Sequence, residues 1–274
     1  MITGVFFLSL VSIFGRLLAS TSGYTNTFFG YCVVLILTTL WLIARGELKS
    51  IFLRSKRIDI LLLGLGQLGS AAFFLQAVRS VDLATAGLLL YSAPLWIVLI
   101  SIMAKTEQIT RKIILPLILG FVGVVLVLAP QLTGQSFDIR FGLLLGLLSG
   151  ISYAVSYIFA RRIGDRMNTA VIVFWAHAIG VVLLLPVLFL YPLPLHTSSL
   201  WLLGIGLSWT FGYFFLYYAL RFIQAHYASM IALFEPVFIA IWGAVFFGES
   251  LTITSVIGGV LILTNVYFIN KATK

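Results

Sequence analysis

Apolar side chains occur in ten long runs along the chain, and most charged residues lie between the runs. Each run is close to the roughly 20 residues that an α-helix needs to cross the ~30 Å hydrocarbon core of a membrane. In lipid, a helix satisfies its backbone polar groups within its own segment, which an isolated strand cannot do. The pattern predicts an all-α polytopic membrane protein with ten transmembrane helices, at residues 2–20, 27–44, 58–78, 84–104, 113–130, 141–160, 169–191, 200–220, 226–247 and 254–270.

Composition supports the membrane interpretation. Hydrophobic residues make up 61% of the 274 residues and charged residues 9%, whereas a soluble domain carries about 25% charged residues. The mean hydropathy is +1.14. The single cysteine, Cys32, lies inside an apolar run, so no disulfide framework is expected. The first run has neither a basic leader nor a small-residue cleavage site, so we expect a span of the mature protein rather than a signal peptide.

The sequence also matches itself at an offset of 142 positions. We therefore expect two homologous halves, residues 1–132 and 133–274, with five spans each. Because five is odd, the second half is expected to be inverted relative to the first. Inverted repeats of this kind are the architecture of many secondary transporters, which place the substrate site near the bilayer midplane between the repeats. The matching pairs are Arg79 and Arg221, Pro94 and Pro236, Glu107 and Glu249, Thr110 and Thr252, and the dipeptides Asn26-Thr27 and Asn168-Thr169.

Basic residues predict the orientation. The net charge is +9, which in a soluble protein would suggest a nucleic-acid partner; here the distribution along the chain accounts for it, and no nucleic acid is expected. Of the 17 Lys and Arg residues, only Arg79 and Arg140 fall in loops on the outer side, and Arg16 lies near the outer end of the first span. The positive-inside rule then places both termini in the cytoplasm. The 14 residues on the cytoplasmic side are Arg45, Lys49, Arg54, Lys56, Arg57, Lys105, Arg111, Lys112, Arg161, Arg162, Arg166, Arg221, Lys271 and Lys274.

Two prolines and one acid lie deep inside the spans. Pro94 and Pro236 are near the centres of the fourth and ninth spans, and each frees a backbone carbonyl of the preceding turn. Broken helices at matched points of two halves point to a transporter site, so we interpret both prolines as gating hinges; two tolerated kinks are the alternative. Glu235 is the one acidic residue deep in any span, and desolvation favours its neutral form. It is a structural hydrogen-bond donor, a contact for a substrate amine or a proton relay.

Polar and aromatic side chains share faces of several spans. Trp209, Tyr213 and Tyr217 follow one another at four-residue spacing in the eighth span. Such hydroxyls and rings suit a small amphipathic organic molecule better than a bare ion, with ordinary helix packing as the alternative. Arg16 either reaches the lipid headgroups or meets a substrate carboxylate. The predicted substrate-binding residues are Ser12, Arg16, Gln67, Tyr91, Tyr153, Tyr157, Trp209, Tyr213, Tyr217 and Glu235.

Short glycine patterns imitate other chemistries. The glycines of residues 64–69 have the spacing of a dinucleotide fingerprint, but they lie inside a span with no strand before it, so we interpret them as helix packing. The glycines of residues 120–123 and 258–259 predict a close contact between the fifth and tenth spans or between protomers. Residues 150–152 match an intramembrane protease element, with His177 on the next span, at a level expected by chance. We expect no enzyme activity, no cofactor and no metal site.

The stretch FEPVFIAIWGAVFFGESLT, residues 234–252, resembles the second-repeat signature of the EamA-type drug/metabolite transporter superfamily. The resemblance rests on Glu235-Pro236 and on Gly248-Glu249 before the last span. The corresponding stretch of the first half, residues 91–110, departs from the family because Thr106 stands where a glycine usually precedes Glu107. The phrases AVRSVDLATAG and ALRFIQAHYAS resemble the family's linkers between the third and fourth spans of each repeat.

This resemblance implies a ten-helix, five-plus-five inverted-repeat transporter of the bacterial cell inner membrane. Its central cavity is expected between spans 1, 3, 4, 6, 8 and 9, which carry the polar faces described above. The expected function is the export of small amphipathic metabolites, amino acids foremost, without ATP and by alternating access. An uptake or exchange carrier for a nucleotide-like cofactor or vitamin is the alternative, and a channel or intramembrane hydrolase is a remote one. The expected partners are a small-molecule substrate and the lipid bilayer, and a homodimer is compatible with the sequence.

Overall fold

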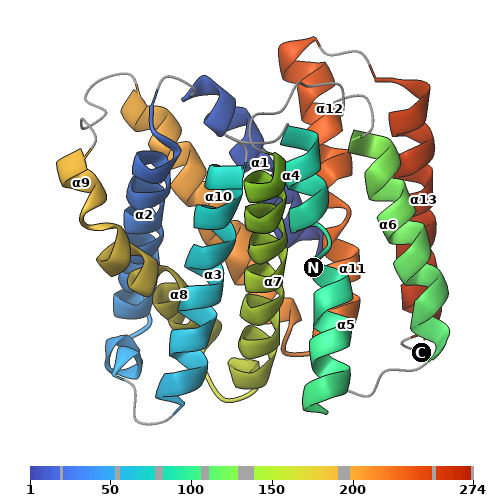
Figure 1. Ribbon diagram of the computed structural model, residues 1–274. Helices are drawn as coiled ribbons and strands as arrows, with labels where there is room; N and C mark the ends of the chain where they lie inside the picture. The colour runs from blue at the N-terminus through green and yellow to red at the C-terminus, as the bar shows by residue number, and fades with distance from the viewer. Residues whose placement is uncertain are drawn as a thin grey trace.

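The computed structural model describes residues 1–18, 21–52, 56–77, 83–105, 111–128, 139–190, 198–248 and 251–272, and these residues form helices without strands (Figure 1). Arg79, Glu107, Thr110 and Glu249 of the sequence repeat, and the ends of several predicted spans, lie outside them. The helices are α1 (Ile2–Leu17), α2 (Gly23–Ala44), η1 (Leu48–Ile51), α3 (Arg57–Ala77), α4 (Leu83–Leu90), α5 (Ala93–Ala104), η2 (Arg111–Ile113), α6 (Ile114–Leu128), α7 (Ile139–Gly164), α8 (Thr169–Leu184), α9 (Val187–Leu190), α10 (Ser198–Ala219), α11 (Ala225–Ala232), α12 (Glu235–Phe247) and α13 (Ile253–Ala272).

The apolar runs form the helices that the sequence predicts. Seven helical segments of the described residues are long and apolar enough to cross a membrane, and α1 and the start of α13 are shorter apolar helices. Large apolar side chains such as Ile36, Met103 and Val245 are exposed on the outside of the bundle, where a soluble protein would place polar groups. The chain is therefore an all-helical protein suited to cross a membrane several times. The count of ten spans stays a prediction.

Three predicted spans are each divided into two helices. The fourth span consists of α4 and α5, separated at Tyr91-Ser92, and the ninth consists of α11 and α12, separated at Leu233-Phe234. The seventh is divided into α8 and α9 by the turn at Leu185-Pro186, which the sequence reading did not predict. Proline lacks the N–H that would continue the helix, which explains a break on its N-terminal side.

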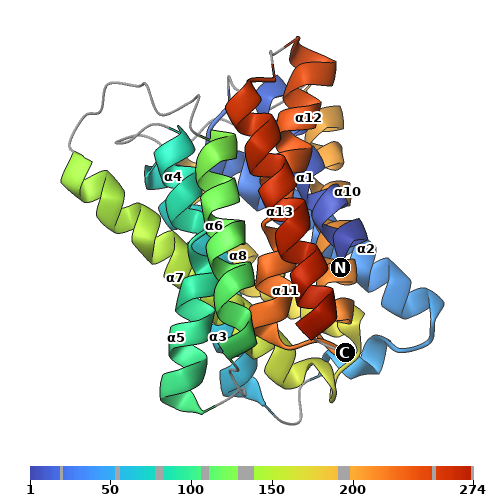
Figure 2. The same cartoon turned by 90° about the vertical axis from the view of Figure 1, so that its right-hand side faces the viewer.

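Helices of the first half pack mainly on helices of the second half. α3 packs on α7 and α1 on α10, and α2 packs on both α8 and α10. α6 and α13 lie side by side at the edge of the bundle in both views (Figures 1 and 2). A Cβ added to Gly123 of α6 would lie 2.8 Å from the carbonyl of Gly258 on α13, so this contact requires glycine. The predicted close contact of the fifth and tenth spans is thus observed within one chain.

The glycines of residues 64–69 also pack helices rather than bind a nucleotide. A Cβ on Gly66 would lie 2.8 Å from the carbonyl of Ser152, so α3 can approach α7 closely only with glycine at this position. α3 and α7 are joined in this way near the middle of the molecule (Figure 1).

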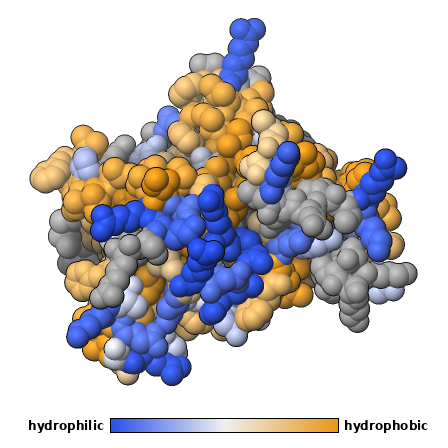
Figure 3. All heavy atoms as spheres, turned by 90° about the horizontal axis from the view of Figure 1, so that it is seen from below, coloured by the Kyte–Doolittle hydropathy of each residue, from blue (hydrophilic) through white to orange (hydrophobic). Residues whose placement is uncertain are grey.

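Charged residues gather at one end of the bundle. Figure 3 shows hydrophilic side chains over the lower face, where α2, α5 and α7 end and α3 begins. Part of this charge is paired. Asp59 Oδ2 lies 3.4 Å from Lys56 Nζ, and Asp59 Oδ1 lies 3.6 Å from Arg162 Nε. Among the described residues, the basic positions near the ends of α2, α5 and α7 and the start of α3 therefore lie at the same end of the bundle.

Candidate functional site

The two broken spans have the same local geometry. Pro94 and Pro236 each occupy the first turn of the second half-helix, α5 or α12. The residues before these half-helices, Ser92 (φ −72°, ψ −7°) and Phe234 (φ −71°, ψ −18°), have nearly the same backbone conformation. A proline in the first turn leaves the new helix intact, because that N–H would have no intrahelical partner. Both breaks lie next to the prolines that were predicted to be hinges, and they are 142 positions apart.

Short turns replace the missing helical bonds at these breaks. The amide of Ser92 donates to the carbonyl of Leu89, and the amides of Leu233 and Phe234 donate to the carbonyls of Met230 and Ile231. Each turn bonds residues three apart instead of four, so it changes the direction of the chain.

Glu235 is the first residue of α12, directly after the second break. It is half-buried and lies close enough to interact electrostatically with Tyr91, Tyr153, Tyr157 and Tyr213. These four tyrosines come from the first break, from α7 and from α10, so groups from both halves lie within electrostatic range of one carboxyl group. A carboxylate at a helix N-terminus is favoured by the helix dipole, and tyrosine hydroxyls can donate hydrogen bonds to it.

The tyrosines of α7 and α10 form a packed cluster. The rings of Tyr153 and Tyr157 meet edge to face, with their hydroxyl oxygens 3.5 Å apart. The rings of Tyr213 and Tyr217 lie 5.6 Å apart. The Tyr217 hydroxyl donates to Oε1 of Gln67 on α3 at 3.1 Å, which joins the two halves. In this structure Tyr213 is 8% exposed and Tyr217 is 0% exposed, so the cluster is closed to a large ligand.

Tyr31 and His177 extend this cluster, and the sequence reading placed neither in the site. The His177 ring lies between those of Tyr31 and Tyr213, at centroid distances of 4.6 and 5.0 Å. Tyr31 also meets Trp209 at 5.1 Å. His177 Nδ1 is 2.7 Å from the carbonyl of Val173. Neither His177 Nε2 nor the Tyr31 hydroxyl has a hydrogen-bond partner within the described part of the chain, although the hydroxyl lies near Gln67. Both groups can therefore form hydrogen bonds with a small polar ligand or with water.

The amino-acid sequence around Tyr31 and His177 does not mark them as members of a site. Tyr31 lies in an apolar run whose polar positions, such as Thr27 four residues before it, are also typical of helix packing, and a lone membrane histidine is usually a packing residue. Their proximity results from the packing of α2 against α8 and α10.

One predicted substrate-binding residue, Arg16, lies apart from the cluster, and another, Ser12, lies on the face of α1 that packs against α12. The Arg16 side chain is exposed and stacks over Phe247 at 4.9 Å, at the far end of α12. Glu235 is about 18 Å away along that helix, at 1.5 Å per residue. The Ser12 hydroxyl bonds back to the carbonyl of Ser9 at 2.7 Å. Ser9 in turn accepts a hydrogen bond from Trp242 Nε1 at 2.8 Å, so this face of α1 is bound to α12.

The structure offers no support for a catalytic pair. Ser152 and His177 lie on α7 and α8, and no hydrogen bond joins them within the described residues. Among those residues there is also no group of three or more His, Cys, Asp and Glu side chains that could hold a metal ion.

Comparison with known proteins identifies the family. The model of the EamA-like transporter family matches residues 1–129 and 140–271. The chain belongs to the EamA-like transporter family. This membership and the apolar helices make it a multi-pass membrane protein of a transporter family.

Relatives of the EamA-like chain carry transporter names. An uncharacterized transporter of Archaeoglobus fulgidus is 30% identical over 213 residues, which cover 77% of this chain and 76% of that protein. The uncharacterized transporter YoaV of Bacillus subtilis is 26% identical, with 78% and 75% covered. The pseudopaline exporter CntI of Pseudomonas aeruginosa is 26% identical, with 73% and 70% covered.

A solved crystal structure shares the fold. It superposes with a TM-score of 0.87 at 17% identity, over 100% of this chain and 96% of the other. At that identity the likeness concerns the arrangement of the helices alone.

Proposed function

We propose that this EamA-like protein is a secondary transporter that moves small amphipathic metabolites, amino acids foremost, through a site between its two halves. The observation that carries the proposal is the pair of matched helix breaks at Pro94 and Pro236, which meet a tyrosine cluster beside Glu235. Interrupted spans at corresponding positions are typical of transporter binding sites, because they bring helix ends and free carbonyls to the substrate.

The proposed architecture is an inverted repeat of residues 1–132 and 133–274. The helix contacts support it. The repeat pairs α1 with α7, α3 with α10, and α5 with α12. The contact of α1 with α10 therefore corresponds to that of α7 with α3, and the contact of α1 with α12 corresponds to that of α7 with α5, and all four contacts are present. The directions of corresponding helices also agree with an inverted repeat. α3 and α6 begin at the lower end of the bundle, and their counterparts α10 and α13 begin at the upper end (Figure 1). A two-fold axis in the membrane plane relates helices in this way.

The groups in the cluster favour an amphipathic substrate with an amine. Glu235 supplies one carboxyl group, and the hydroxyls of Tyr31, Tyr153 and Tyr213, with the amide of Gln67, supply neutral donors and acceptors. Aromatic faces such as that of Trp209 suit an ammonium or an apolar side chain. Arg16 of α1 is left out of this proposed site because its side chain lies over Phe247, at the far end of α12. Ser12, on the same helix, stays a proposed substrate contact. The tyrosines are closed in this structure, so access requires the half-helices α5 and α12 to move at their prolines, as alternating access demands.

The direction and the orientation are further parts of the proposal. Export is supported by the relative named as a pseudopaline exporter. Cytoplasmic termini in the inner membrane of a bacterium are supported by the hydrophilic side chains gathered at one end (Figure 3), where α2 ends before Arg45, α3 begins at Arg57 and α7 ends after Arg161 and Arg162.

A transport screen tests the function. Purified protein in proteoliposomes is assayed for counterflow of labelled amino acids, nucleotides and vitamins. Saturable exchange of an amino acid supports the proposal, and exchange of a nucleotide or vitamin alone assigns the alternative carrier. Non-saturable ion or solute flux indicates a channel. Hydrolysis of a substrate by the purified protein, without transport, would overturn the proposal.

A further inference from the structure

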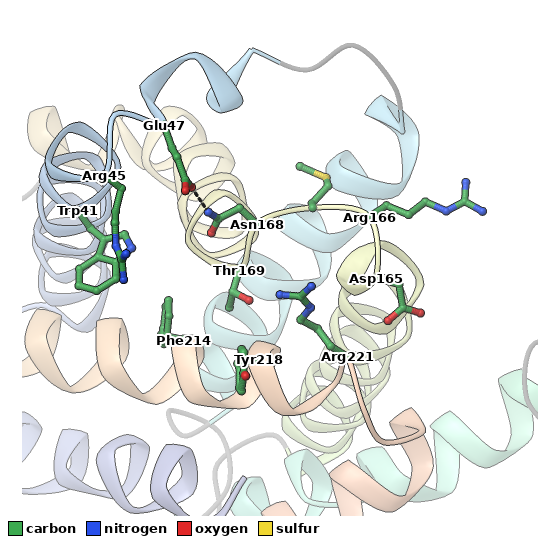
Figure 4. A pocket seen from close by; sticks show the side chains of 11 residues that line it. Trp41, Arg45, Glu47, Asp165, Arg166, Asn168, Thr169, Phe214, Tyr218 and Arg221 are labelled. Atoms are coloured by element: carbon green, nitrogen blue, oxygen red, sulfur yellow. Dashed lines mark hydrogen bonds between the residues drawn. The ribbon is translucent and has the colours of Figure 1, made fainter.

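A polar cavity lies outside the tyrosine cluster, at the basic end of the bundle. It has a volume of about 530 Å³ and lies between the end of α2, the start of α8 and the last turns of α10 (Figure 4). This size is enough for a small organic headgroup. The residues that line it are Trp41, Arg45, Glu47, Asp165, Arg166, Met167, Asn168, Thr169, Phe214, Tyr218 and Arg221.

The cavity has an excess of positive charge. Three arginines line it, whereas both of its carboxylates are already engaged. Asp165 accepts a hydrogen bond from Arg161 at 2.9 Å, and Glu47 accepts one from the amide of Asn168 (Figure 4). Among the described residues, Arg221 has no ion pair or hydrogen bond from its guanidinium, and in Figure 4 the group points toward Thr169. An arginine without a carboxylate partner at the wall of a cavity favours an anion.

Thr169 provides a second, independent indication of a ligand. Its side chain lines the cavity, is 3% exposed, and its hydroxyl has no hydrogen-bond partner among the described residues. Thr169 is also the first residue of α8, whose 16 residues direct a helix dipole with its positive end at the cavity. The Asn168 side chain already accepts from the amide of Ala170, so a ligand need not replace that cap. The hydroxyl, the helix end and Arg221 together form a site for a phosphate-sized anion.

The aromatic residues of the cavity indicate where the anion comes from. Trp41 and Tyr218 are each 47% exposed, on the outer faces of α2 and α10, where the bundle also exposes Leu40, Ile43 and Phe222. Trp41 stacks with the guanidinium of Arg45 at 5.1 Å. Tryptophan, tyrosine and arginine side by side are typical of the boundary between hydrocarbon and headgroups. The cavity therefore adjoins the lipid as well as the solvent.

We propose that this cavity binds the phosphate of an anionic lipid headgroup, through Arg221 and Thr169, with Arg45 and Trp41 at its lipid side. The site is separate from the tyrosine cluster and does not depend on the proposed substrate. A free phosphomonoester offers the same chemistry, and the test distinguishes the two sources.

Native mass spectrometry of the detergent-solubilised protein measures the binding. The protein is titrated with phosphatidylglycerol, with phosphatidylcholine, and with phosphatidylglycerol in the presence of glycerol 3-phosphate. The variants are Arg221→Gln and Thr169→Val. The matched control is Arg111→Gln, which removes an exposed charge at the same end of the bundle but outside the cavity. The unfolding midpoint of each variant is recorded in the same detergent without lipid.

We expect one phosphatidylglycerol molecule to bind about tenfold more tightly than phosphatidylcholine, and Arg221→Gln to lose about this factor. Thr169→Val should weaken binding while leaving the unfolding midpoint equal or higher, because it removes an unpaired buried hydroxyl. A purely structural role of Thr169 would instead lower the midpoint.

Competition by glycerol 3-phosphate at its own saturating concentration assigns the site to a soluble phosphate. Failure of that competition assigns it to the lipid. Equal binding of the two lipids, or equal losses in Arg221→Gln and Arg111→Gln, would overturn the proposal.

Discussion

Replacing Tyr217 with Phe tests the hydrogen bond that joins the two halves at the cluster. The change removes one hydroxyl, whose bond to Gln67 is 3.1 Å long, and leaves the ring in place. Both side chains are buried, so Gln67 Oε1 loses its donor without gaining water. Hydrogen bonds between membrane helices contribute about 0.6 kcal/mol on average and up to about 1.7 kcal/mol. We therefore expect the free energy of unfolding to fall by about 1 kcal/mol.

Thermal unfolding of the purified protein measures this loss. For a chain of this size, about 1 kcal/mol corresponds to a fall of about 2–4 °C in the unfolding midpoint. Tyr267→Phe is the matched control, because Tyr267 is 65% exposed on α13. The single variant Gln67→Met and the double variant Tyr217→Phe, Gln67→Met complete a double-mutant cycle. The double variant should lose less free energy of unfolding than the sum of the two single variants, because neither partner is then left unpaired. Additive losses, or an unchanged midpoint in Tyr217→Phe, would refute the assignment of this bond.

The other predictions concern transport and orientation. Tyr213→Ala should lower the rate of substrate exchange at least about tenfold, because it removes the ring and hydroxyl at the centre of the cluster. The control is Phe211→Ala, which changes an exposed residue of the same helix and should transport normally. Normal exchange in Tyr213→Ala would mean that the cluster only packs the helices together. Glu235→Gln should raise the KM for amino acids and spare uncharged substrates, because it removes the charge proposed to meet the substrate amine; loss of pH-gradient-driven accumulation with intact counterflow would instead make Glu235 a proton carrier, and unchanged transport in both assays would leave it a structural role. A reporter that fluoresces only in the cytoplasm should give signal when fused after Lys274, and signal from a periplasmic reporter there instead would reverse the proposed topology.

Much of the fold can be predicted from the properties of single segments of the sequence. Apolar runs of membrane length must become helices, because lipid offers no other partner for their backbone groups. Pro94 and Pro236 each interrupt the hydrogen bonding of the turn before them, since the missing N–H is a property of the residue. The family follows from residues such as Glu235-Pro236 in the same way. These features depend on each segment by itself, so they could be predicted without knowing which helices touch.

The tertiary structure alone decided which polar groups meet. Gln67 and Tyr217 are 150 positions apart, and their bond exists because α3 and α10 present these side chains to each other. Tyr31 and His177 joined the cluster although neither has a distinctive pattern around it. Arg16, equally polar and equally plausible by sequence, lies at the other end of α12. In a membrane, apolar lateral faces resemble one another, so sequence periodicity shows that a helix has a polar face but not which partner faces it.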